Sequence, residues 1–172
     1  GRFTWRHNTV LNHLTTTLIE NKPENIEIRS DIPGLDLNGG TIPPYILLTT
    51  LRPDLVILNR QEKKISVLEL PCSFESNIMS ANARKSLKYT QLKLDLEEAG
   101  YTCSLLPFEV GSRGYVRKAN RANLINTFVT NNTKANALKC IKQLSKLSLL
   151  CSFSVFHAYT QPTWRDPPFL KP

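Results

Sequence analysis

Apolar residues recur at helical spacing near the start of the chain, at Val10, Leu11, Leu14 and Leu18. This spacing puts them on one face of a helix and predicts a helix over residues 4–20. Thr4 is a candidate N-cap, because a threonine hydroxyl can accept a hydrogen bond from a backbone N–H group of the first turn. Pro23 ends the pattern, since proline removes a helical hydrogen bond.

Alternating and continuous apolar runs then predict strands. Ile26 and Ile28 alternate with polar residues in "NIEIRSDI", and a loop rich in Gly and Pro, "PGLDLNGGTIPP", follows. Residues 55–58 form a short apolar run, a polar turn comes next, and residues 65–69 alternate again. The last two segments together predict a hairpin.

The second half of the chain predicts a helix, a strand and further helices. Residues 76–99 have a helical pattern and end at Gly100, a residue suited to the position just after a helix. A strand is expected in "YTCSLLPFEVG", and two helices are expected over about 117–130 and 133–150, with room to continue toward Ala158. The tail "QPTWRDPPFLKP" is too rich in Pro to be regular.

This order of elements predicts the α/β fold class. We expect a mixed sheet core flanked by helices over residues 1–116, and a helical extension with a Pro-rich tail over residues 117–172 that packs on the core. The last helix carries an apolar stripe that we expect to pack on the sheet: Leu138, Ile141, Leu144 and Leu147. A basic stripe runs beside it: Lys139, Lys142 and Lys146.

The charge balance favours a polyanionic partner. The 172 residues include 22 Lys and Arg against 14 Asp and Glu, a net charge of +8, which points to nucleic acid first; ordinary solubility is the alternative. No apolar run approaches the roughly 18 residues of a membrane span, so we expect no membrane partner. The four cysteines lie far apart without a CxxC pair, which indicates neither zinc nor a disulfide framework. The chain begins without Met or a signal peptide, so we expect it to be a piece of a longer polypeptide.

Two acids interrupt the predicted hairpin at the end away from its turn. With the turn centred between Gln61 and Glu62, facing residues have numbers that sum to 123, and Asp54 faces Glu69. The same sum pairs the apolar residues: Leu58 with Ile65, and Val56 with Val67. The two acids would then have Cβ atoms about 4.5–5.5 Å apart on one face of the sheet. Such close like charges favour a divalent cation between them; Mg²⁺ takes carboxylate ligands, keeps several waters and activates one for attack on phosphorus.

The alternative is that Asp54 and Glu69 are ordinary charges at the fraying end of a hairpin. The next predicted helix favours the metal site, because one of its sides carries a set at helical offsets: Ala81, Lys85, Lys88, Tyr89 and Leu92. A lysine beside the metal can orient the attacking water or stabilise charge on phosphorus. Lys85 with Tyr89 is the first candidate and Lys88 the second; a solvated basic face is the alternative.

Six motifs in order carry a resemblance to a known family: "GRFTWRHNTVL", "GGTIPP", "RPDLVIL", "ELPCSFE", "KSLKY" and "PFEVGSRGYV". Together they resemble the restriction-like endonuclease domain of site-specific non-LTR retrotransposons. Pro53-Asp54, followed by an acid after 14 residues, is similar to the PD-(D/E)xK nuclease motif. The lysine expected two residues after Glu69 is Pro71 here, so the resemblance implies that Lys85 or Lys88 replaces it.

The resemblance implies a restriction-endonuclease-like core that nicks double-stranded DNA in a Mg²⁺-dependent reaction, with Mn²⁺ substituting. Asp54 and Glu69 would bind the metal, and Tyr89 would support the site. The freed 3′-hydroxyl would prime reverse transcription of the element RNA by the reverse transcriptase portion of the same polyprotein. Action in the nucleus follows from the same resemblance.

Several basic residues are candidates for contacts with DNA phosphates along a channel: Arg84, Arg113, Arg117, Lys118 and Arg121. For Arg113, within "GSRG", the alternative is a loop in which the glycines simply turn the chain. His7 lies on the predicted first helix. In nucleases of the fold that the resemblance implies, the first helix approaches the metal site. His7 either assists there or is a polar surface or packing residue.

Two other functions compete with the nuclease. One is a catalytically inactive DNA-binding module derived from such a nuclease, which keeps the basic surface and loses the metal. The other is a protein-interaction domain built on the C-terminal helices. Packing in the core explains their apolar stripe more simply.

Overall fold

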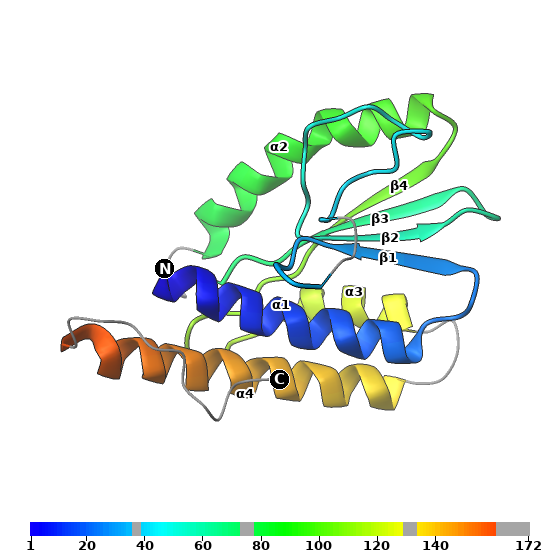
Figure 1. Cartoon of the computed structure of the whole chain (residues 1–172). Helices are drawn as coiled ribbons and strands as arrows, with labels where there is room; N and C mark the ends of the chain where they lie inside the picture. Colours follow the sequence, from blue (N-terminus) through cyan, green and yellow to red (C-terminus); the bar gives the residue numbers. More distant parts are fainter. Residues whose placement is uncertain (36–38, 73–77, 129–133, 161–172) are drawn as a thin grey trace.

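The computed structural model describes residues 1–35, 39–72, 78–128 and 134–160 of the chain. Within this part, a four-stranded mixed sheet is flanked by helices (Figure 1). The elements follow one another as α1 (Arg2–Asn21), β1 (Ile26–Ser30), β2 (Leu55–Asn59), β3 (Lys64–Glu69), α2 (Ile78–Glu98), β4 (Thr102–Pro107), α3 (Lys118–Phe128), α4 (Lys134–His157) and the short 3₁₀ helix η2 (Ala158–Thr160). The predicted α/β class is confirmed at this level.

The strands lie in the order β1-β2-β3-β4. The first three form an antiparallel meander, whereas β4 is parallel to β3 and is reached through α2, as a parallel connection requires. The predicted hairpin register is confirmed, with Val56 facing Val67 and Leu58 facing Ile65. Lys63, in the turn of this hairpin, has a φ of 50°.

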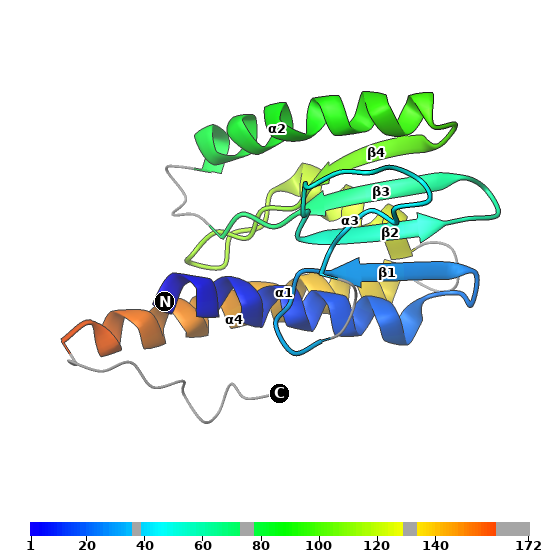
Figure 2. The ribbon, with the colours of Figure 1, turned by 45° about the horizontal axis from the view of Figure 1, so that its top comes forward.

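Helices cover the two faces of the sheet (Figures 1 and 2). On one face, α2 buries Tyr89, Leu92 and Leu96 against a set of strand side chains: Val56, Leu58, Ile65 and Val67. On the other face, α1 buries Val10, Leu11 and Leu14 against Leu55 and Leu68. Because strand side chains alternate between faces, the pattern of each strand decides which residues meet which helix.

The last helix, α4, packs along α1 and not on the sheet as predicted (Figure 1). Ile141 and Leu144 are buried in the same core as α1, but Leu138 is 46% exposed. The stripe correctly marked a buried face, yet α1 already covers the sheet there, so α4 forms a further layer outside it.

Other helix boundaries are close to the prediction. Helix α1 begins at Arg2 with Gly1 as its N-cap, so Thr4 lies inside the helix and does not cap it. Helix α2 ends at Glu98, and Gly100 follows with a φ of +85°, as suits the residue after a helix. Among the helices in the described ranges, none is long and apolar enough to cross a membrane.

Candidate functional site

Asp54 and Glu69 lie at one end of the sheet and are tied to each other's strands. Asp54 comes directly before β2, and Glu69 is the last residue of β3. The backbone N–H of Asp54 donates to Glu69 Oε1 at 3.3 Å, and the backbone N–H of Leu70 donates to Asp54 Oδ2 at 2.8 Å. Each carboxylate is therefore held by a backbone donor beside the other acid, which keeps both at the same rim.

The backbone of Asp54 is also fixed from the neighbouring strand. Its carbonyl oxygen accepts hydrogen bonds from the backbone N–H of Asp31 at 3.0 Å and from Ser30 Oγ at 3.1 Å. Strand β3 ends at Glu69, and Pro71, which cannot donate to a ladder, lies just beyond. The two acids thus lie where the sheet ends; Glu69 is buried, whereas Asp54 is partly exposed and faces α1.

His7 approaches Asp54 from the first helix. Its Nε2 lies 3.3 Å from Asp54 Oδ2, and the two side chains are 25% and 17% exposed. His7 Nδ1 lies 3.1 Å from Asn8 Oδ1, which fixes the orientation of the ring from its other side. Of the two alternatives left by the sequence, the structure places His7 beside the carboxylate pair.

Tyr89 connects α2 to Glu69. Its ring is buried on α2, and burial raises the pKa of its phenol above its ordinary value. The hydrogen bond to Glu69 and the negative charges of Glu69, Asp54 and Asp31 raise this pKa further. Tyr89 is therefore a neutral phenol near neutral pH, and its hydroxyl lies within reach of two acceptors, the Glu69 carboxylate and, at 3.4 Å, the Arg52 carbonyl oxygen.

Lys88 stands next to this phenol. Its Nζ donates to the Tyr89 hydroxyl at 3.2 Å and lies 4.9 Å from the centre of the Tyr89 ring. A chain of contacts thus leads from an exposed ammonium group through Tyr89 to Glu69. Lys85 and Arg84 belong to α2, but their side chains lie outside the described residues.

The loop before β2 supports Asp54 through a feature that sequence reasoning missed. Gly40 has a φ of +68°, and a Cβ at this position would lie 2.1 Å from the carbonyl oxygen of Pro53. Nearby, Arg52 pairs with Asp31 at 2.7 Å and donates to the carbonyl of Gly39 at 3.2 Å. The Gly-Gly pair in "GGTIPP" was the available signal, because adjacent glycines mark a close backbone approach.

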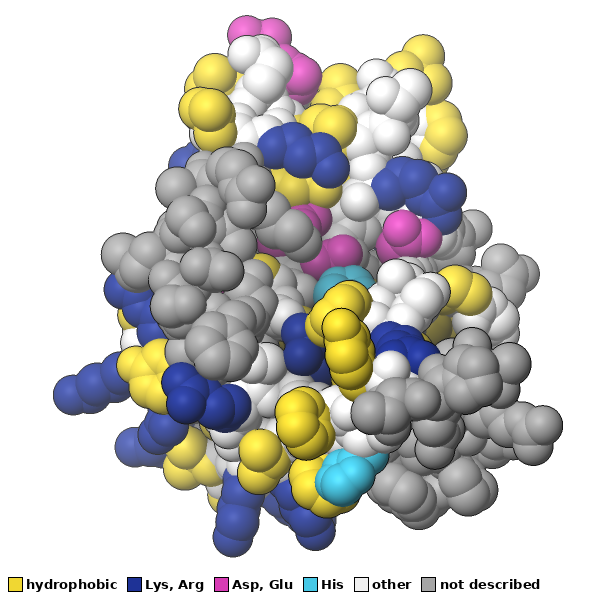
Figure 3. Space-filling view, turned by 90° about the vertical axis from the view of Figure 1, so that its left-hand side faces the viewer, with side chains coloured by type: hydrophobic (Ala, Val, Ile, Leu, Met, Phe, Trp, Pro, Cys, Tyr) yellow, Lys and Arg dark blue, Asp and Glu magenta, His cyan; other side chains and the backbone are white. Residues whose placement is uncertain are grey.

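The candidate DNA-binding residues fall into two groups. Arg113, Lys118 and Arg121 are exposed on the loop after β4 and on α3. Arg117 Nη1 lies 3.9 Å from Oε2 of the fully buried Glu109, so part of its charge faces inward. Figure 3 views the end of the molecule with the acids and shows acidic side chains grouped between Lys and Arg, with a histidine beneath them.

The donor set at this rim is that of a hard divalent cation. Carboxylate oxygens are the ligands that Mg²⁺ and Mn²⁺ prefer, and Asp54 and Glu69 supply two such groups at one rim. In the part of the chain that the structure describes, no three His, Cys, Asp or Glu side chains converge on one metal position. Water or substrate oxygens would complete the coordination, as is usual for Mg²⁺.

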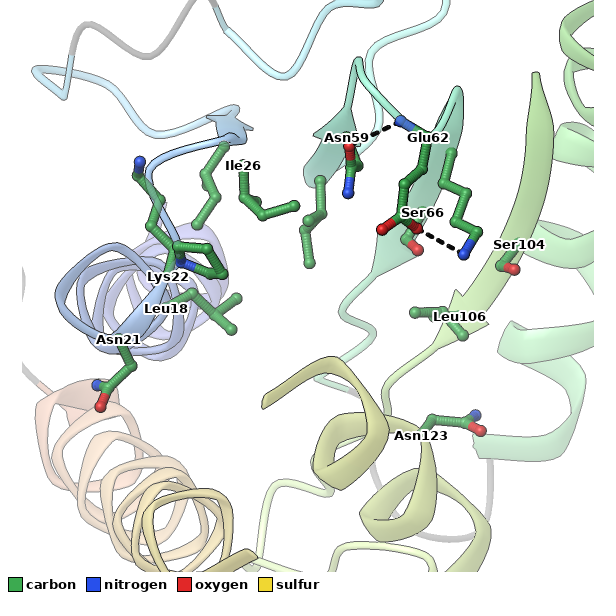
Figure 4. A pocket seen from close by; sticks show the side chains of 14 residues that line it. Leu18, Asn21, Lys22, Ile26, Asn59, Glu62, Ser66, Ser104, Leu106 and Asn123 are labelled. Atoms are coloured by element: carbon green, nitrogen blue, oxygen red, sulfur yellow. Dashed lines mark hydrogen bonds and ion pairs between the residues drawn. The ribbon is translucent and has the colours of Figure 1, made fainter. Parts of the chain in front are cut away.

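A separate cavity lies at the opposite end of the sheet (Figure 4). It has a volume of about 400 Å³ between α1, the strands and α3, with Ile26, Asn59 and Lys64 among its lining residues. Those residues occupy the strand ends away from Asp54 and Glu69. Its rim includes the ion pair between Glu62 and Lys64, and we assign no chemistry to it.

No protein-family model matches this chain, and no curated protein sequence matches it. The functional proposal therefore rests on the contacts between residues of this chain.

Proposed function

We propose that this domain is a metal-dependent DNA endonuclease with a restriction-endonuclease-like fold. The observation that carries the proposal is the pair Asp54 and Glu69, each held by a backbone N–H beside the other. A four-stranded mixed sheet with helices on both faces is compatible with that fold. The basic balance of the chain favours a polyanionic substrate.

Each side chain at the rim has a distinct task in this proposal. Asp54 and Glu69 would hold the ion, which would supply positive charge at the scissile phosphate and acidify a bound water. Tyr89 donates to Glu69 and so orients that carboxylate, while His7 positions Asp54. Lys88, which donates to Tyr89, would stabilise the charge that develops on phosphorus; Lys85, the first candidate from the sequence, is the alternative for this role.

The six sequence motifs support a specific setting for this chemistry. The nicked strand would supply a 3′-hydroxyl that primes reverse transcription of an element RNA, in the nucleus, by a reverse transcriptase in the same polyprotein. Double-stranded DNA is then the substrate. Mg²⁺ is the working ion, and Mn²⁺ substitutes.

A DNA-binding module without catalysis is the second candidate. The observation that favours it is Pro71 in the position where the nuclease motif carries its lysine. This candidate keeps the exposed Arg113, Lys118 and Arg121, and requires no ion. It predicts DNA binding that is indifferent to Mg²⁺.

A plasmid-nicking assay separates the two candidates. We expect the chain to convert supercoiled plasmid to open circles with Mg²⁺ or Mn²⁺ and to stop when the ion is chelated. Asp54→Asn and Glu69→Gln should each lower the rate on the order of 100-fold or more, with the fold retained by circular dichroism. Glu62→Gln is the matched control, because Glu62 is an exposed acid on the hairpin turn that pairs with Lys64.

Two outcomes would overturn the nuclease. One is plasmid binding without any metal-dependent nick, which would leave the binding module. The other is an Asp54→Asn variant that nicks as fast as the parent, which would place the activity elsewhere or in a contaminant.

A further inference from the structure

The outer face of α4 carries a stripe of mixed character. The face toward α1 and the core is buried, at Cys140, Ile141, Leu144 and Cys151. On the opposite side, five residues recur every three or four positions and therefore line up along the helix: Lys142, Lys146, Leu149, Phe153 and Phe156. We call these five residues the α4 stripe. A surface helix normally turns polar residues outward, but Leu149, Phe153 and Phe156 are 50%, 61% and 76% exposed.

The charge of the chain is concentrated around this stripe. Between Glu109 and Asp166 the sequence contains nine Lys and Arg and not one Asp or Glu. The remaining residues hold 13 Lys and Arg against 14 Asp and Glu, so their charges nearly cancel. The net charge of +8 therefore resides almost wholly in the segment that forms the loop after β4, α3 and α4.

The loop with Arg113 is fastened to α4 beside the stripe. Ser148 Oγ donates to the carbonyl of Gly111 at 2.8 Å, and Ser145 Oγ donates to the carbonyl of Gly114. Gly114 has a φ of +85°, and a Cβ there would lie 2.6 Å from the carbonyl oxygen of Ser145. The loop backbone thus rests directly on α4, which brings Arg113 close to the residues flanking Lys146.

The aromatic end of the stripe lies near the candidate active site. Ser152, the neighbour of Phe153, accepts a hydrogen bond from Arg6 Nη1 at 3.0 Å. Arg6 precedes His7, whose ring is 3.3 Å from Asp54. Figure 1 shows the last turns of α4 and the first turn of α1 at the same end of the molecule.

We propose that the α4 stripe, with Arg113 at its border, binds a single-stranded nucleic acid. Its lysines contact phosphates, and the rings of Phe153 and Phe156 stack on unpaired bases. Exposed aromatic rings interleaved with basic residues are how proteins bind single strands without sequence preference, whereas a duplex hides its base faces. A protein partner is less suited to this surface, because lysine is depleted at the centre of protein interfaces. The inference does not depend on metal chemistry.

Fluorescence anisotropy with the whole chain tests this surface. The probes are a labelled mixed-sequence 20-nucleotide strand and the same strand in a duplex, both with EDTA so that cleavage plays no part. The double variant Phe153→Ala/Phe156→Ala should weaken single-strand binding by about 10-fold or more and duplex binding far less. Lys142→Ala/Lys146→Ala should weaken both and reduce the salt dependence of both.

The matched control is Tyr45→Ala, which removes a 63% exposed aromatic ring that lies over Arg60, away from α4. It should leave both affinities unchanged. The inference is overturned if the Phe variant binds the single strand as the parent does, if it loses duplex and single-strand affinity equally, or if the Phe residues prove necessary for self-association or for binding anionic vesicles instead. If the chain binds the single strand in EDTA but does not nick plasmid, the nuclease proposal fails and this inference stands. If the chain nicks plasmid but the Phe variant binds the single strand as the parent does, this inference fails and the nuclease proposal stands.

Discussion

The hydroxyl of Tyr89 joins α2 to Glu69 of the carboxylate pair. Burial raises the pKa of this phenol, and its hydrogen bond to Glu69 with the nearby negative charges raises it further. Because the phenol loses its proton only well above its ordinary pKa, it keeps donating to Glu69 throughout the usual range of assay pH.

Tyr89→Phe therefore removes the hydroxyl with little change in packing. The ring stays among the buried residues of that face, and the hydroxyl's contacts with Glu69, with the Arg52 carbonyl and with Lys88 are lost together. We expect nicking to fall about 10- to 100-fold, as for other groups that orient a metal ligand. The parent's rate should show no decline from tyrosine ionisation up to about pH 9.5, measured in the plasmid assay. An unchanged rate in Tyr89→Phe would mean that this hydroxyl does not orient Glu69.

His7 holds Asp54 from the other side of the sheet, at 3.3 Å. We expect His7→Ala to raise the Mg²⁺ concentration needed for half-maximal nicking by about 10-fold, since Asp54 loses a group that orients it. His13→Gln is the matched control, because His13 lies on the same helix and its contacts include the charge of Glu20 and not the carboxylate pair. The measurement is the nicking rate of both variants as a function of Mg²⁺ concentration. Equal midpoints would make His7 a packing residue.

The loop between β1 and β2 positions Asp54, the residue directly before β2. At Gly40 the backbone combines a φ of +68° with a contact in which a Cβ would lie 2.1 Å from the Pro53 carbonyl. That carbonyl belongs to the residue just before Asp54, so any side chain at position 40 would displace Asp54.

Gly40→Ala should consequently damage both stability and cleavage. The left-handed backbone alone costs a residue with a side chain about 1–2 kcal/mol, and the overlap with Pro53 adds to that. Gly34→Ala is the matched control, because Gly34 has a φ of +86° but nothing within 4 Å of the added Cβ. Urea unfolding should show a larger loss for Gly40→Ala, and its nicking rate per folded molecule should fall. If both variants lose equal stability and keep the parent's rate, the contact with Pro53 does not position Asp54.

Local patterns allowed the elements and the hairpin register to be predicted from sequence. Pairing Asp54 with Glu69 needed only the turn position and the alternation of side chains, and the observed register agrees. The partner of the last helix could not be predicted in this way. An apolar stripe shows which face of a helix is buried, but whether α1 or the sheet covers it depends on the layering of the whole domain.

Contacts between distant segments limited what the sequence could show of the site. His7 reaches Asp54 only because α1 crosses the end of the strands, and Arg6 is buried because α4 lies beside it. Neither pairing has a fixed spacing along the chain. The sequence favours Lys85 over Lys88 by its helical spacing to Tyr89; the structure shows the contact of Lys88 with Tyr89, and the side chain of Lys85 lies outside the described residues.

At the scale of the whole molecule, the acidic pair and the basic segment have different roles in the proposed function. The acids at the sheet rim lie in the nearly neutral part of the chain, while the residues after Glu109 carry the excess positive charge. In the proposed function, the basic segment would attract the phosphate backbone and the two carboxylates would hold the ion.

The salt dependence of duplex binding measures how much of that surface is used. Each neutralised phosphate contributes about −0.9 to the slope of log K against log salt concentration on duplex DNA. Alanine substitution of the exposed Arg113, Lys118 and Arg121 together should make the slope shallower by about 2 to 3. Lys93→Ala on α2 is the control and should leave the slope unchanged, because Lys93 pairs with Glu97 at 3.7 Å. A triple variant with the parent's slope would place the duplex on another face, and the carboxylate rim would then need a different route to its phosphate.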